Sequence, residues 1–266
     1  MLISSGQNPR VKAVVRLRER RHRQAEGVLI VEGADELTLA LEAGVRPTQV
    51  FVCRELSQAR PGGAPRQPPL PGDVEVIEVT APVFAKLAYR ENPDGWLAVV
   101  PAPWSGLEAL AARLSPNPLL LVCEAVEKPG NLGAMLRTAD AAGVDALLVC
   151  DPGTDPGNPN VVRASRGTLF TVPVALASGA EALAWLRARG IMTVAATPQA
   201  ERLYTQVDLR GPAAIVVGAE DQGLSEPWLR RADQQARIPM AGRVNSLNVS
   251  AAAALLLYEA VRQRGR

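Results

Sequence analysis

The carboxyl-terminal part of the chain repeats one pattern, in which a short, almost continuously apolar run is followed by a stretch of helical character. We interpret the apolar runs as strands, at 119–126, 145–150, 169–175, 191–197, 213–219 and 235–241. Helices are expected near 131–142, 160–166, 179–189, 225–231 and 246–264. A strand that is apolar along its whole length is buried on both faces, which is typical of a parallel sheet covered by helices. The pattern therefore predicts an α/β fold with a parallel sheet.

The amino-terminal part predicts a second, smaller α/β unit. A helix is expected to begin at Asn8 and Pro9, because an asparagine cap followed by proline favours a helix start. Further on, the sequence alternates between predicted strands and helices, at 28–32, 34–43, 48–53, 74–78, 82–89 and 95–100. Residues 101–117, which begin and end near prolines, are interpreted as a linker. We therefore predict one domain at 1–100 and another at 118–266.

Cysteine and histidine are too scarce for several kinds of site. Cys53, Cys123 and Cys150 lie in or at the end of apolar runs without a CxxC pair. We expect them to be buried free thiols, and we expect no metal site. His22 is the only histidine, so we expect no Ser-His-Asp triad, and we expect any acid–base chemistry to use other side chains.

Targeting and membrane signals are also lacking. The first residues do not have the pattern of a signal peptide. The longest apolar runs, such as AAAALLL at 251–257, are far shorter than the roughly 20 residues that a membrane span needs. We therefore expect a cytoplasmic protein with no membrane partner.

Positive charge is concentrated in one segment. The net charge of +2 gives no sign of a nucleic-acid partner, which usually requires a basic excess. Residues 10–23, however, contain only one acid, Glu19, among seven basic side chains: Arg10, Lys12, Arg16, Arg18, Arg20, Arg21 and Arg23. On composition alone, both a solvated basic helix and a phosphate-binding surface fit this cluster.

Glycines and polar side chains gather in three loops of the second domain. In the first loop, Asn131 is placed to cap a helix that carries Arg137. In the second, glycines on either side of Glu220 predict a bent loop. In the third, Ser246, Asn248 and Ser250 open the last helix, where simple capping needs only one of them. The glycine spacings fit neither a Rossmann fingerprint nor a P-loop, so nucleotide phosphates are not the expected ligand.

Taken together, these loops resemble the signature motifs of the SPOUT superfamily, in its SpoU/TrmH branch of RNA 2′-O-ribose methyltransferases. The first motif reads Asn131-x-Gly133-Ala134-x-x-Arg137-Thr138-Ala139. The second reads Val217-Gly218-x-Glu220-x-x-Gly223-Leu224-Ser225. The third reads Ile238-Pro239-Met240-x-Gly242-x-x-x-Ser246-Leu247-Asn248-Val249-Ser250. The resemblance covers 118–266 and includes VVRASRGTLFTVPV at 161–174.

Two further points concern the extent of the resemblance. The region 1–100 looks like the family's L30e-like substrate-binding domain, through NPRVK at 8–12 and VEG at 31–33. One departure lies in the second motif, where the family often has Asn-Glu-Gly and this chain has Ala219-Glu220-Asp221. Glu220 itself is kept.

The resemblance implies a fold, a cofactor and an assembly. The catalytic domain would contain a deep trefoil knot, although general topology rules exclude knots. The cofactor would be S-adenosylmethionine, and family members are homodimers. The residues expected to bind the cofactor are Thr197, Pro198, Val217, Gly218, Ala219, Glu220, Gly223, Ile238, Pro239, Met240, Ser246, Leu247 and Asn248.

The resemblance also implies a mechanism and a substrate class. The expected catalytic residues are Asn131, Arg137, Glu220, Ser246 and Asn248. Because a guanidinium keeps its proton, we expect Arg137 to bind the target phosphate and hold the ribose hydroxyl rather than to act as a base. RNA would be bound by Arg10, Lys12, Arg16, Arg20, Arg23 and Arg137.

The identity of the substrate stays open. Family analogy favours 23S ribosomal RNA over transfer RNA. A catalytically inactive rRNA-binding factor on the same fold and a small-molecule methyltransferase are the alternatives. The sequence does not separate a housekeeping role from protection of a producer's ribosome against its own antibiotic.

Overall fold

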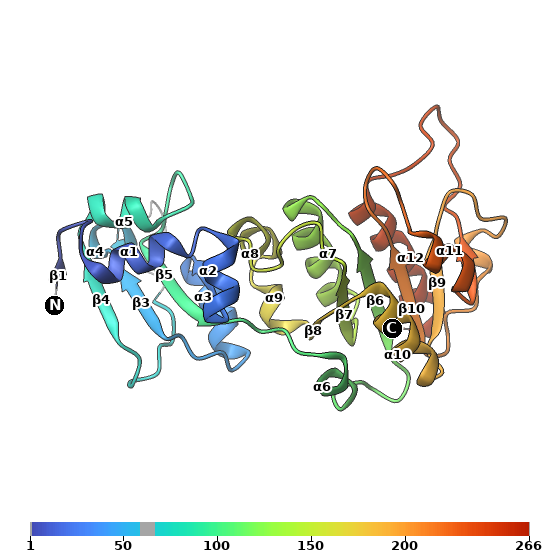
Figure 1. The fold of residues 1–266 in the computed structure, drawn as a ribbon, viewed down its shortest axis with the longest axis horizontal. Helices are drawn as coiled ribbons and strands as arrows, with labels where there is room; N and C mark the ends of the chain where they lie inside the picture. The colour runs from blue at the N-terminus through green and yellow to red at the C-terminus, as the bar shows by residue number, and fades with distance from the viewer. Residues whose placement is uncertain (1, 59–66, 266) are drawn as a thin grey trace. The chain divides into compact units, whose positions relative to one another are not determined.

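The computed structural model describes residues 2–58 and 67–265, which form two compact units (Figure 1). Unit 1 comprises Met1–Pro103 together with Gly157–Thr171, and unit 2 comprises Trp104–Pro156 and Val172–Arg266. The segment Gly157–Thr171 therefore packs in unit 1, although it lies within the stretch predicted as the second domain.

Unit 1 is built on a five-stranded mixed sheet with the order β1-β4-β3-β5-β2. Its strands are β1 Leu2–Ile3, β2 Val28–Glu32, β3 Gln49–Val52, β4 Val76–Val79 and β5 Trp96–Pro101. Its helices are α1 Pro9–Arg16, α2 Arg20–Glu26, α3 Ala34–Glu42, α4 Arg54–Gln58, α5 Ala81–Leu87, α8 Pro159–Ser165 and α9 Thr168–Thr171. One core, with Phe51, Phe84 and Leu97 at its centre, packs α1 and α5 against the sheet.

The segment 157–171 covers a sheet edge of unit 1. Helix α8 contacts β2, which is an edge strand, and α9 contacts α3. Gly167, between the two helices, has a φ of +92°, and a Cβ built there would lie 2.7 Å from Leu39 Cδ1 in α3. Only glycine combines this backbone conformation with so close an approach.

Unit 2 contains a six-stranded sheet in which every pairing is parallel, with the order β11-β9-β10-β6-β7-β8. Its strands are β6 Leu119–Glu124, β7 Ala146–Cys150, β8 Val174–Ala177, β9 Met192–Ala196, β10 Ala213–Val217 and β11 Gln234–Ala236. The parallel α/β fold predicted from the apolar runs is confirmed.

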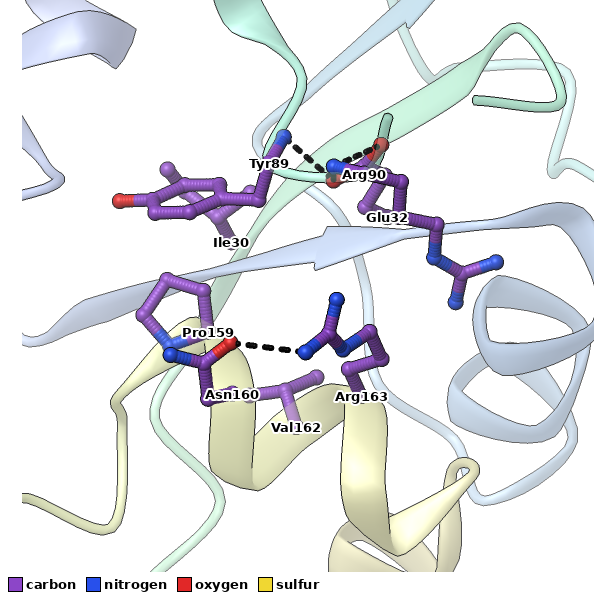
Figure 2. Close-up of a pocket in the computed structure, with 8 residues that line it drawn as sticks. All are labelled: Ile30, Glu32, Tyr89, Arg90, Pro159, Asn160, Val162 and Arg163. Carbon is purple, nitrogen blue, oxygen red and sulfur yellow. Dashed lines mark hydrogen bonds between the residues drawn. The ribbon is translucent and has the colours of Figure 1, made fainter. Parts of the chain in front are cut away.

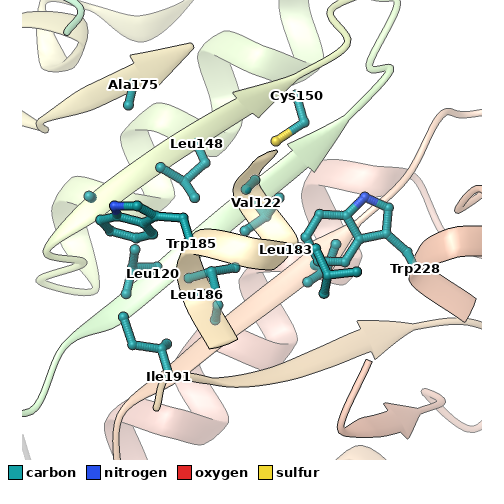
Figure 3. Close-up of a cluster of buried hydrophobic side chains, with 14 of the residues drawn as sticks. Leu120, Val122, Leu148, Cys150, Ala175, Leu183, Trp185, Leu186, Ile191 and Trp228 are labelled. Atoms are coloured by element: carbon teal, nitrogen blue, oxygen red, sulfur yellow. The ribbon is translucent and has the colours of Figure 1, made fainter. Parts of the chain in front are cut away.

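Helices cover both faces of this sheet. On one face α7 Pro129–Ala141 and α12 Val249–Arg264 contact each other. The other face carries α6 Leu107–Ala111, α10 Gly179–Ala188 and α11 Glu226–Arg231. Trp185, Leu186 and Trp228 fill the core on that side (Figure 3). The 3-10 helix η1 Tyr204–Gln206 lies between β9 and β10 in the chain.

The structure corrects four local predictions, one of which is the strand expected at 235–241, because β11 covers only Gln234–Ala236. Residues 169–175 are not one strand, because Thr168–Thr171 form a helical turn that buries Leu169 and Phe170, and β8 begins only at Val174. Helix α7 begins at Pro129, two residues earlier than expected, so Asn131 does not cap it. The last helix begins at Val249, and Asn248 is its cap.

Three further sequence predictions concern the cysteines, metal-binding groups and membrane-spanning helices. All three cysteines are buried free thiols, as expected. Within the described residues, no group of His, Cys, Asp and Glu side chains is arranged to hold a metal ion. No helix in the same part of the chain has the length and apolar character needed to cross a membrane.

Candidate active site

The site lies at the carboxyl ends of two neighbouring strands of unit 2. From β6 the chain proceeds to β7 and β8 on one side, whereas β10 is followed by β11 on the opposite side, beyond β9. In parallel sheets, a crevice forms outside the carboxyl ends of strands at such a switch in direction, and ligands bind there. The loops after β6 and β10, which are two of the three motif loops, both begin at this point. The order of the strands therefore places these two loops at the expected ligand-binding crevice.

Glu220, in the loop after β10, joins the two loops through its carboxylate. It accepts hydrogen bonds from Glu127 N at 3.1 Å, Lys128 N at 3.2 Å and Asn131 Nδ2 at 2.6 Å. Burial raises the pKa of Glu220, but the bonds from Glu127, Asn131 and Lys128 together outweigh burial and leave the pKa below its ordinary value. A negative charge at the amino terminus of α7 also complements the helix dipole.

Asn131 continues this connection to the third motif loop. Its Oδ1 accepts a hydrogen bond from Asn248 Nδ2 at 3.1 Å. Asn248 Oδ1 in turn accepts from Ser250 N at 3.0 Å and Ser250 Oγ at 2.6 Å, which caps α12. Glu220, Asn131, Asn248 and Ser250 therefore form one hydrogen-bonded chain through all three loops.

The loop after β10 is folded tightly on itself. Ala219 N donates to Gly223 O at 3.0 Å, and Gly223 N donates to Ala219 O at 2.9 Å. A Cβ at Gly218 would lie only 2.2 Å from the backbone carbon of Gly223, and Gly223 has a φ of +70°. Both glycines are needed for the bend that directs Glu220 toward α7.

Two of the predicted catalytic residues stand outside the hydrogen-bonded chain. Arg137 is exposed on α7, and no hydrogen bond or ion pair engages its guanidinium among residues 2–58 and 67–265. Ser246 is exposed, and its Oγ lies 3.5 Å from Asn245 Oδ1. Both side chains are accessible to a substrate.

The residues predicted to bind the cofactor surround the same edge with different degrees of burial. Val217, Gly218, Ala219 and Thr197 are buried, and Thr197 N donates to Ala236 O at 3.0 Å. Ile238 and Met240 are half-buried, whereas Pro198, Gly223, Pro239 and Leu247 are exposed. Partly uncovered apolar side chains next to tightly turned backbone fit an adenosine with an attached sulfonium, whose binding surface is mostly apolar.

The residues predicted to bind RNA in unit 1 do not form one solvated helix. The basic segment is broken into α1 and α2 at 17–19. Arg23 is buried, and its guanidinium donates to Leu17 O and Arg18 O, both at 2.7 Å. Arg10 forms an ion pair with Glu75, whereas Lys12, Arg16 and Arg20 are exposed. Arg23 therefore stabilises the turn between α1 and α2 and does not face the solvent.

Sequence reasoning missed the role of Glu124 at the end of β6. This buried carboxylate accepts hydrogen bonds from Ser225 N at 2.8 Å and Ser225 Oγ at 2.5 Å. Ser225 stands at the cap position of α11, but its side chain donates to Glu124 and makes no capping bond to the helix. An acid that ends a wholly apolar strand was the available signal, because a buried charge needs a partner.

Family models match both parts of the chain. The SpoU rRNA methylase family matches residues 118–258, and an MRM3-like substrate binding domain matches residues 8–98. The chain belongs to the SpoU rRNA methylase family, as its three motifs predict.

Similar proteins extend this assignment over nearly the whole chain. A crystal structure of an RNA 2′-O ribose methyltransferase is 44% identical, with a TM-score of 0.83 and 100% of each chain covered. An AdoMet-bound rRNA methyltransferase from Sinorhizobium meliloti is 30% identical, with a TM-score of 0.86, and covers 98% of this chain and 97% of its own. A 23S rRNA (uridine(2479)-2′-O)-methyltransferase of Streptomyces viridochromogenes is 33% identical over 93% of this chain and 87% of that protein.

Proposed function

We propose that the chain transfers a methyl group from S-adenosylmethionine to a ribose 2′-hydroxyl in 23S ribosomal RNA. The observation that carries this proposal is the hydrogen-bonded chain Glu220–Asn131–Asn248, which ties the three motif loops together at the strand ends of unit 2. The membership of the family and the activities named for its relatives support the reaction class.

The cofactor would lie among the residues after β9, β10 and β11. Backbone of the bent loop at 218–223 and the side chains of Ile238, Met240 and Leu247 would hold it. When bound, S-adenosylmethionine supplies the methyl group that a ribose 2′-oxygen attacks in line. The chain's own contribution is positioning, which can supply a large share of a rate enhancement.

Arg137 is proposed to bind the phosphate next to the target ribose and to orient its hydroxyl. Its guanidinium has the forked donor geometry that suits a phosphate, and it has no competing partner within the described residues. Glu220, Asn131 and Asn248 are proposed to act through the loops that they hold together, and the exposed Ser246 is proposed to contact the substrate directly.

Unit 1 is proposed to bind the RNA first, through the exposed side chains of Lys12, Arg16 and Arg20 with Arg10 beside them. Such contacts release counterions from the phosphates, so the affinity should fall as salt is raised. With a ribosomal RNA substrate, the proposed location of the protein is the cytoplasm. The trefoil knot implied by the family stays a prediction.

We further propose that the chain acts as a homodimer. Leu255 and Tyr258 on α12 are 40% and 50% exposed, although this helix also buries Leu256 and Leu257. Exposed apolar residues that lie together on a helix indicate a surface that another chain covers.

The decisive experiment measures the transfer of labelled methyl groups from S-adenosylmethionine to a 23S rRNA transcript, followed by mapping of 2′-O-methyl positions. The wild type should methylate one ribose, and Arg137→Ala should abolish transfer while its cofactor affinity stays within a few-fold. Arg230→Ala, which removes an exposed arginine of α11 outside the site, is the control and should keep full activity.

Other outcomes would select the alternatives. Methylation of transfer RNA but not of the 23S transcript would identify a tRNA enzyme. RNA binding without any transfer would identify a non-catalytic factor. Near-normal turnover by Arg137→Ala would refute the role given to that residue.

A further inference from the structure

Unit 1 contains a pocket that the proposed reaction does not use. It is lined from β2, from the turn after α5 and from α8, by Ile30, Glu32, Tyr89, Arg90, Pro159, Asn160, Val162 and Arg163. Figure 2 shows Pro159, Asn160, Val162 and Arg163 on one wall, with Tyr89 and Arg90 on the wall opposite. The pocket is therefore formed jointly by the substrate-binding region and by the segment 157–171.

The two carboxylates at this pocket are already engaged by its frame. Glu32 accepts hydrogen bonds from Tyr89 N at 2.8 Å and from Arg90 N at 3.3 Å. Glu36, beside the pocket, accepts from Arg90 Nη2 at 2.6 Å. These acids hold the turn at Tyr89 and Arg90 in place against β2 and α3.

In contrast, the hydrogen-bond donors of Arg90 and Arg163 are not all paired within the described residues. Arg90 Nε is buried and has no hydrogen-bond partner within the described residues. Arg163 is exposed, and the partner of its guanidinium is the neutral Asn160 Oδ1 at 3.2 Å, with no ion pair in that part of the chain. Arg90 and Arg163 line the same pocket, and a buried unpaired donor together with a guanidinium that has no ion pair indicates a ligand that supplies acceptor oxygens and negative charge.

Further positive charge lies next to the pocket. The Arg18 guanidinium lies 5.1 Å from the centre of the Tyr89 ring and donates to Ala88 O at 2.9 Å.

The enclosed space has room for about one water molecule. A single oxygen fits it, whereas a nucleobase does not. We propose that this pocket binds a phosphate of the RNA backbone, with Arg163 as its main cationic contact. The inference rests on the proposed function and extends the RNA-binding surface from α1 and α2 to α8.

The test measures the affinity of the full-length chain for the 23S rRNA transcript at several salt concentrations. Arg163→Gln should weaken binding about fivefold and reduce the slope of log affinity against log salt by about one, because one phosphate contact is lost. Arg46→Gln is the matched control, since Arg46 is an exposed arginine of the same unit that pairs with Asp73 at 3.1 Å. It should change neither quantity.

Each outcome has a defined meaning. Equal affinity and equal salt slope for Arg163→Gln and the wild type would overturn the phosphate subsite. Titration with inorganic phosphate distinguishes a free anion: phosphate binding that is lost in Arg163→Gln, with RNA affinity unchanged, would also overturn it. Methyl transfer by the wild type on the same transcript tests the proposed function separately, and a wild-type chain that does not bind the transcript would refute both.

Discussion

Glu220 illustrates how one side chain both shapes and charges the site. Its carboxylate accepts two backbone N–H groups before α7 and one side-chain amide, so only acceptor oxygens suit this position. The family resemblance identified Glu220 as a site residue. The resemblance did not predict its contacts, which are to the backbone before α7 and to Asn131.

Replacing Glu220 by glutamine should lower the free energy of unfolding by about 1–3 kcal/mol at neutral pH, because an amide NH2 group would face backbone donors. The pKa of Glu220 is lowered in the folded chain from its ordinary value of 4.5. Its contribution to stability is therefore complete above that value and is lost as the pH falls through the folded-state pKa. Denaturant unfolding of both chains between pH 3 and 7 checks this, and a difference that does not shrink at low pH would contradict it.

Arg23 should behave differently from the exposed basic residues around it. Arg23→Ala removes two charge-assisted bonds to Leu17 O and Arg18 O and should cost about 2–3 kcal/mol of stability. Arg20→Ala should leave stability nearly unchanged but weaken RNA binding. Thermal melts and RNA titrations of the two variants separate these effects, and equal melting temperatures would show that the buried contacts contribute little.

The sequence predicted the positions of some of these side chains but not of others. Composition identified the basic cluster at 10–23, but no local pattern distinguishes Arg23, whose burial depends on the break between α1 and α2. The contact between Asn131 and Asn248 joins residues 117 positions apart. Only the motif resemblance placed them at one site, because short-range periodicity carries no information on such pairs.

At the scale of elements, apolar runs predicted the parallel sheet well because a strand buried on both faces needs no alternation. The same signal failed at 169–175, where Leu169 and Phe170 are buried in a helical turn that belongs to unit 1. Short apolar runs do not distinguish a strand from one helical turn. In this case the packing of α9 against α3 favours the helical turn over a strand.

Arg264 and Gln263 fasten the end of α12, and Gln263 donates to Val207 O at 2.9 Å and accepts from Leu209 N at 2.8 Å. The Arg264 guanidinium donates to Leu209 O at 2.9 Å, Asn117 O at 3.0 Å and Gly211 O at 2.5 Å, so it fastens the helix to the segments before β6 and β10. Arg264→Ala should lower the free energy of unfolding by about 1–3 kcal/mol, because partly buried carbonyls lose a charged donor. Arg230→Ala, at an exposed ion pair, should cost less than about 1 kcal/mol in the same denaturant measurement. Similar losses in both variants would argue against this fastening role.

For the whole molecule, the proposed assembly rests on one face of α12. Ala251, Leu255 and Tyr258 are exposed at spacings of four and three residues, so they share a face. Leu255→Glu should weaken dimerisation by about tenfold or more, because a carboxylate would be buried in the interface. Val76→Glu, at an exposed apolar residue of unit 1, is the control and should not change the sedimentation coefficient. A wild-type chain that sediments as a monomer at every concentration would refute the dimer.

The packing of 157–171 in unit 1 limits how this protein can be divided or recombined. A fragment cut after residue 103 would lack α8 and α9, and would leave the β2 edge and part of α3 bare. Exchange of amino-terminal domains between relatives at residues 101–117 would therefore separate Gly167 from its neighbour Leu39. The unit that folds together is therefore not one continuous stretch of sequence. A functional chimera has to include residues 157–171 together with the amino-terminal region against which they pack.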